Sequence, residues 1–199
     1  MRQPHHPEPD PVGPGQESVW DYPRPAIAEP TSRHVQVIHR GITLADSRSA
    51  WRTLETSHPP TYYIPPEDVA TDCLAANPSR RSLCEWKGQA RYFDVVIGDQ
   101  RIDAAAWSYP DPSASFAGIA DYFAFYPDPF DACLIDGEKI VEIGSGLNAP
   151  NGVEYHDGAL YVAEISRITK WVGLEKPQAS ATSVAVRSVS QSIRLAFSS

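Results

Sequence analysis

Proline is the residue that most constrains this chain, because it recurs from the first residues to the last third of the sequence. The 199 residues include 19 prolines. Proline has no amide N–H and a fixed φ angle, so it ends helices and is excluded from the interior of central strands. Long helices, and with them helical bundles, are therefore disfavoured. Five tryptophans and a hydrophobic content of 42% still favour a packed core, and the length suits one ordinary domain with a short appendage.

Charge and cysteine content narrow the class of protein further. The formal net charge of −8 argues against nucleic acid as a partner, because that binding depends on clustered lysine and arginine. Cys73, Cys84 and Cys133 form no C-x-x-C pair, so we expect neither a disulfide framework nor a zinc knuckle. No run of about 18 apolar residues occurs, which predicts no membrane span, and residues 1–16 lack the apolar h-region of a signal peptide. We expect a cytoplasmic protein of bacterial type without a metal or organic cofactor.

Alternating and β-branched segments predict many short strands. Strands are expected at residues 35–37, 42–44, 50–54, 61–64, 82–86, 90–97, 101–109, 123–126, 132–135 and 138–143. Asp136-Gly137 is typical of a type I′ hairpin turn. Proline near the start and apolar residues at helical spacing predict two short helices, from Pro66 to about Ala76 and from Asp111 to Tyr122. The fold class predicted is therefore mainly β.

The two ends of the chain differ from its middle. Residues 1–16 are rich in proline and charge, and we expect them to be a disordered leader. After Ile143 the sequence is rich in turn residues, with one further hairpin expected at 153–155 and 159–165. Residues 172–199 are rich in serine and carry weak structural signals.

Six ordered blocks of sequence stand out along the chain: Trp20-x-Tyr22-Pro23, Ile42 to Ser47, Glu55 to Tyr63, Cys84 to Tyr92, Ala106 to Pro110 and Ala124 to Tyr126. Together these blocks resemble the bacterial domain-of-unknown-function family 427. The resemblance covers residues 17–139. It implies a β-tent, a fold in which two antiparallel sheets lean together over a cleft, and we expect this domain to span residues 17–143. Zinc-binding relatives of this architecture use paired C-x-x-C knuckles, which this sequence lacks. The family also carries a nucleotidyltransferase-like label, but the chain has no glycine-serine followed by paired aspartates to hold magnesium.

A second, shorter likeness runs from Gly146 to Val153 and from Asp157 to Glu164, within residues 144–171. This segment resembles one blade of a sorbosone or glucose dehydrogenase β-propeller. A propeller needs several blades to close its ring, so no quinone-dependent activity is expected from one. We interpret the segment as the remnant of a gene fusion or of a shifted reading frame.

The chemically densest stretch, residues 82–92, predicts one wall of a small-molecule site. Lys87 precedes Gly88, whose missing Cβ lets a ligand approach, so the lysine is either an anion anchor or an ordinary solvated side chain. Glu55 ends a predicted strand, where it accepts hydrogen bonds from a ligand or pairs with Lys87. Tyr63, Trp107 and Tyr109 are expected to wall the pocket or to belong to the core. Alternation sends Tyr62 and Tyr63 to opposite faces of a strand and puts Trp107 and Tyr109 on one face.

Cys84 has two interpretations. Beside a histidine it would be a nucleophile, with His58 the nearest candidate, whereas a buried free cysteine is commonly inert. The leading hypothesis is a small-ligand-binding module that uses Glu55, Tyr63, Cys84, Lys87, Trp107 and Tyr109. The alternatives are an enzyme with Glu55 as general base near Lys87, and a protein-interaction module whose contact is the aromatic arm from Trp20 to Ile27.

Overall fold

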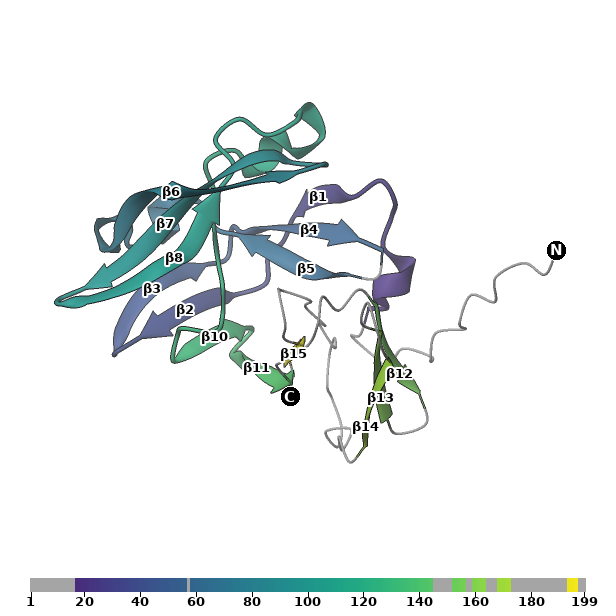
Figure 1. The fold of residues 1–199 in the computed structure, drawn as a ribbon. Helices are drawn as coiled ribbons and strands as arrows, with labels where there is room; N and C mark the ends of the chain where they lie inside the picture. The colour runs from purple at the N-terminus through teal and green to yellow at the C-terminus, as the bar shows by residue number, and fades with distance from the viewer. Residues whose placement is uncertain are drawn as a thin grey trace.

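The computed structural model describes residues 17–56 and 58–144, and beyond them the strands at 152–156, 159–163, 168–172 and 193–196. The protein is mainly β, as predicted, and all of its named strand pairs are antiparallel (Figure 1). The helical segments of this part of the chain are short 3-10 turns. They are η1 (Val19–Asp21), η2 (Pro66–Asp68), η3 (Thr71–Cys73) and η4 (Ala114–Ile119).

The N-terminal arm leads into a three-stranded sheet. Its order is β1-β4-β5, with β1 at Ile27–Pro30, β4 at Trp51–Glu55 and β5 at His58–Tyr63. Tyr22 and Ala26 of the arm are buried, and the Thr56 hydroxyl donates a hydrogen bond of 2.5 Å to the Tyr22 carbonyl. The arm is therefore part of the packed structure.

A second sheet has the order β15-β11-β10-β2-β3. Its strands are β2 (Val35–His39), β3 (Ile42–Ser47), β10 (Ala132–Ile135), β11 (Glu138–Gly144) and β15 (Ile193–Ala196). Asp136 and Gly137, between β10 and β11, both have positive φ angles, +54° and +85°. A type I′ turn requires this geometry, so the predicted hairpin turn is confirmed.

The third sheet has the order β6-β7-β8-β9 and carries most of the candidate site. Its strands are β6 (Leu74–Cys84), β7 (Gly88–Ile97), β8 (Gln100–Ser108) and β9 (Phe123–Phe125). The prediction of a helix as far as Ala76 is wrong, because Leu74 to Asn77 already pair with β7. Pro78 lies where the register shifts between Asn77 and Arg81. A bulge in an edge strand tolerates proline because its amide is not needed for pairing.

The second predicted helix, Asp111 to Tyr122, shrinks to the six residues of η4. The Asp121 amide donates to the Tyr109 carbonyl at 3.0 Å, which closes the segment into a loop anchored at the end of β8. The loop carries Phe116 and Ile119 into the core, where both are buried. Tertiary burial of these two side chains, rather than helix propensity, therefore decides the local structure.

The β6-β7-β8-β9 sheet has a core on each of its faces. Ala90 and Tyr92 of β7 join one cluster, and Phe93 and Val95 join the other, as strand alternation requires. We call the first the aromatic cluster; its buried members are Ala26, Tyr63, Ala90, Tyr92, Ala104, Trp107, Tyr109, Phe116, Ile119 and Ala124. The other cluster is mostly aliphatic and includes Val35, Val37, Leu44, Ile64, Val95 and Ile135.

A pair of backbone hydrogen bonds joins β5 to β9. Ile64 and Phe123 exchange N–H···O bonds of 2.7 and 2.8 Å. The β1-β4-β5 sheet is thereby connected to the β6-β7-β8-β9 sheet. The connection brings Tyr63, at the end of β5, beside the aromatic side chains of β8.

Three further strands, which precede β15 in the sequence, form a three-stranded sheet. It consists of β12 (Gly152–His156), β13 (Ala159–Ala163) and β14 (Ile168–Val172), in that order. β12 and β13 are the predicted hairpin, and β14 is a strand that the sequence did not predict. The leader at 1–16 and most of 172–199 lie outside the described residues. None of the helical segments described has the length and apolar character that a membrane crossing requires.

Candidate functional site

Most of the predicted site residues meet in the aromatic cluster. Tyr63, Trp107 and Tyr109 are 1%, 6% and 6% exposed, and Cys84 is half-buried against them. The Tyr63 ring lies edge-on to Trp107 with 6.4 Å between centroids, and 6.1 Å from the Tyr109 ring. As alternation predicts, Tyr62 packs instead against the aliphatic cluster. The structure therefore brings together four side chains that are separated by up to 46 residues of sequence.

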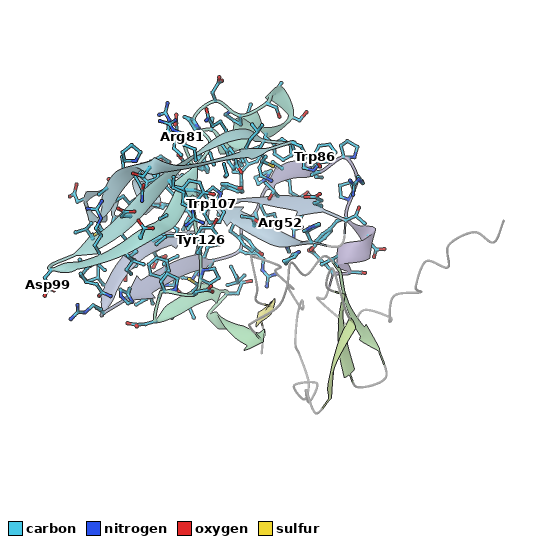
Figure 2. The ribbon with its side chains drawn as sticks, viewed as in Figure 1. Arg52, Arg81, Trp86, Asp99, Trp107 and Tyr126 are labelled. Carbon is cyan, nitrogen blue, oxygen red and sulfur yellow. The ribbon has the colours of Figure 1, made fainter. Side chains whose placement is uncertain are left out.

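Cross-strand register builds the centre of this cluster. Tyr92 of β7 lies opposite Trp107 of β8, which lies opposite Ala124 of β9. Directly opposite residues share a face of the sheet, so the small Ala124 leaves room beside the Trp107 indole. Tyr126 follows β9 and stacks at a tilt on Trp107, with 4.5 Å between centroids (Figure 2).

The cluster contains polar atoms as well as rings. Burial raises the pKa of Tyr109, and the neighbouring Tyr63, Cys84 and Tyr92 groups raise it further. The Tyr92 hydroxyl lies 2.9 Å from the Ser82 hydroxyl on the neighbouring strand. These groups offer a bound molecule hydrogen-bond donors and acceptors in an otherwise apolar setting.

Trp86 is a member of the site that the sequence reasoning missed. It is half-buried at the turn between β6 and β7 and packs against the aromatic cluster. Its indole N–H donates to Glu55 Oε1 at 3.2 Å, and its carbonyl accepts from the Ser113 hydroxyl at 2.7 Å. The guanidinium of Arg24 lies 6.0 Å from its ring centroid. Its place between Cys84 and Gly88 was the only signal in the sequence.

Lys87 and Glu55 both lie beside the cluster but do not form a pair with each other. The Lys87 ammonium lies 5.4 Å from the Phe116 ring centroid, a cation–π contact. Glu55 pairs with Trp86 instead, so the ion pair considered from the sequence is not formed within the described residues. Figure 2 shows Trp86 near the end of the β6–β7 hairpin, which places the neighbouring Lys87 at the same end.

Two arrangements considered from the sequence do not occur in the part of the chain described. His58 is exposed and its Nδ1 contacts the Thr56 carbonyl at 3.0 Å rather than the Cys84 thiol. No three His, Cys, Asp or Glu side chains among the described residues come together as a metal site. The Cys84 thiol therefore packs against the aromatic cluster, and His58 is not placed to act as its base.

These features define a mainly β protein with a buried aromatic cluster at the junction of two antiparallel sheets. The family described as domain of unknown function (DUF427) matches residues 27–136, more than half of the chain. The chain belongs to this family. A search of curated proteins found no match.

Proposed function

We propose that the protein is a binding module for a small planar molecule that carries a negative charge. The observation that carries the proposal is the composition of the aromatic cluster, in which tyrosine hydroxyls and a thiol converge among aromatic rings. Trp51, Trp86, Tyr122, Tyr126 and Cys84 around it are only partly buried, so they would form the rim. Aromatic walls with a few polar groups are the usual composition of small-molecule sites.

The cations beside the cluster favour an anionic group on the ligand. Lys87 lies over Phe116 and Arg24 lies over Trp86, and neither has an acidic partner among the described residues. A cation held against a ring is partly desolvated, so it gains more from an incoming carboxylate than a fully solvated cation would. An aromatic carboxylate is the simplest molecule that suits both features. We place this site in a cytoplasmic domain of the β-tent type spanning residues 17–143.

The test is a titration with benzoate, 4-hydroxybenzoate and indole-3-carboxylate, followed by tryptophan fluorescence and thermal unfolding, with benzamide as the uncharged analogue. A ligand of this class at about 100 times its Kd stabilises the folded state by about 3 kcal/mol. Replacing Lys87 by Gln is expected to weaken binding of the acids by about tenfold, because a charge-assisted hydrogen bond is lost. Arg81→Gln is the control, because it removes the same charge from an exposed position of β6, and it is expected to leave the affinity for the acids unchanged.

Equal binding of benzoate and benzamide, or equal loss in the two variants, would contradict an anchor at Lys87. No fluorescence change with any of the three acids would contradict the proposal as a whole. Turnover of a bound acid that disappears in Glu55→Gln would favour the enzymatic alternative. The aromatic arm is a weaker candidate for partner binding, because Tyr22 and Ala26 are already buried within the protein.

A further inference from the structure

The positively charged side chains that the structure describes, all within residues 17–137, fall into two groups. Arg33, Arg40, Arg48, Arg52 and Arg101 each have a polar side-chain partner. Arg24, Arg80, Arg81, Lys87 and Arg91 have no such partner in this part of the chain, and all belong to the β6–β7 hairpin or touch its Trp86. In a protein with a net charge of −8, this hairpin is a local site of unbalanced positive charge.

Arg81 and Arg91 form the most unusual part of this hairpin. They lie directly opposite each other in the antiparallel pair of β6 and β7, so their side chains project from the same face. Both are exposed. Like charges in this position repel and destabilise a sheet, and neither has a side-chain contact within the described residues that offsets the repulsion.

An exposed leucine lies on the same face. Leu83 is two residues from Arg81 on β6 and is 81% exposed, the highest exposure among the large hydrophobic side chains described. The opposite face of these strands holds Ser82, Cys84 and Tyr92 and belongs to the aromatic cluster. The face with Arg81, Leu83 and Arg91 is therefore separate from the proposed ligand site.

β6 is also an edge strand in the part of the chain that the structure describes. It pairs with β7 on one side, and the sheet ends there. The alternate backbone N–H and C=O groups of residues 81–84 therefore point away from β7 without a strand to receive them. Such an edge is a template for an additional strand.

We propose that residues 81–84 of β6 dock an extended acidic segment of a partner protein, which adds to the sheet as a strand. Acidic side chains of the segment pair with Arg81 and Arg91, and an apolar side chain packs on Leu83. This arrangement removes the repulsion between the arginines, covers the leucine and satisfies the open backbone groups. A small anion would satisfy only the arginines, and a nucleic acid would leave both the leucine and the backbone edge uncovered.

The experiment uses a capped, fluorescein-labelled peptide with the repeat Glu-Thr-Val-Thr, which presents glutamate and valine in turn on the same face of an extended strand. A peptide with lysine in place of each glutamate is the charge-reversed probe. Fluorescence anisotropy is expected to show binding of the glutamate peptide only, weakened by added salt. The double substitution Arg81→Glu with Arg91→Glu is expected to weaken binding by about tenfold or more, and Leu83→Ser by a further few-fold. Amide hydrogen exchange of residues 81–84 is expected to slow when the peptide is bound.

Arg40→Glu with Arg48→Glu is the matched control, because it makes the same change in net charge at exposed positions at the two ends of β3, away from β6. Equal loss of binding in this control would overturn the proposal, as would equal binding of the lysine peptide. Unchanged hydrogen exchange, with competition by inorganic phosphate, would assign the arginines to a small-anion site instead. Concentration-dependent dimerisation that Arg81→Glu abolishes would assign the edge to a second copy of this chain.

Discussion

At the scale of single residues, Gly118 shows how closely the rim of the aromatic cluster is packed. A Cβ atom at this position would lie 2.2 Å from Cη2 of Trp51 and 2.3 Å from its Cζ3. The Trp51 indole therefore packs against η4 at a position that has room only for glycine. The indole can occupy this place at the rim because Gly118 has no Cβ atom.

Replacing Gly118 by Ala is expected to destabilise the protein by about 2 kcal/mol, because the methyl group displaces the Trp51 ring. The measurement is chemical unfolding, with Ala117→Ser on the exposed side of η4 as the control. In a Trp51→Ala background the same glycine substitution is expected to cost little, since the clash is gone. An equal cost in both backgrounds would show that the ring is not the cause.

At the scale of elements, Asp94 holds together the irregular parts of β6, β7 and β8. The register of β7 and β8 shifts around it, and Ala104 in the shifted segment has a φ angle of +46°. The buried Asp94 carboxylate accepts three hydrogen bonds of 2.7 Å each. The donors are the backbone amide of Ala104, the side-chain amide of Asn77 and Nε of Arg101. A bulge leaves backbone groups unpaired, and this carboxylate satisfies one of them.

Asp94→Ala is expected to cost about 3 kcal/mol, because it leaves the buried Ala104 amide without its acceptor and removes one of the two acceptors of the Asn77 side chain. Burial alone raises the pKa of Asp94, but the hydrogen bonds from Ala104, Asn77 and Arg101 outweigh it and leave the pKa below the usual 3.8. The ionised carboxylate therefore stabilises the fold above that pH, and this contribution is lost as the pH falls through the lower, folded-state value.

Chemical unfolding at a series of pH values between neutral and acid measures this contribution. The loss of stability on acidification is expected to be smaller in Asp94→Asn than in the unsubstituted protein. Asp99→Asn, at the exposed turn between β7 and β8 that Figure 2 labels, is the control and is expected to change stability by less than about 0.5 kcal/mol. The same pH dependence with and without the Asp94 carboxylate would contradict its role.

At the scale of the whole molecule, one sheet separates two cores. The bonds between Ile64 and Phe123 connect this sheet to the strands that begin with the N-terminal arm. Burial is the first cause of the raised pKa of Tyr22, Tyr62 and Tyr109, which lie in different parts of this arrangement. Tyrosine ionisation is therefore coupled to unfolding of the molecule as a whole.

The protein is expected to lose stability as the pH rises above about 10. Below that value these tyrosines are neutral in both states. Above it the unfolded state releases their protons while the folded state retains them, so unfolding is favoured. Ultraviolet absorbance of tyrosinate and circular dichroism, followed together, are expected to change in one transition.

Tyr109→Phe is expected to make this alkaline loss of stability less steep, because one coupled proton is removed. The free energy of unfolding of the Tyr109→Phe variant at neutral pH is the control, because it measures the effect of the substitution without any ionisation. Ionisation of these tyrosines well before the loss of circular dichroism would contradict the coupling.

The fold was predictable from the sequence where local patterns decide it. Alternation separated Tyr62 from Tyr63 and grouped Trp107 with Tyr109, and Asp136-Gly137 predicted its turn. The predictions of two helices were wrong because the sequence carries helix-start signals around Pro66 and Asp111 but does not show the tertiary contacts that compete with a helix. Burial of Phe116 and Ile119 and pairing of Leu74 to Asn77 with β7 determined those segments instead.

Local patterns are sufficient to predict the mainly β class and several members of the aromatic cluster, because alternation and turn residues act within a few positions of the chain, and six sequence blocks indicate the family. The contact of Glu55 with Trp86 rather than with Lys87, in contrast, depends on how distant strands pack together. The same holds for Tyr92 beside Trp107 and for Arg81 opposite Arg91. Each of these contacts depends on the register between strands, and a shift of one residue in that register would turn the side chains to the other face.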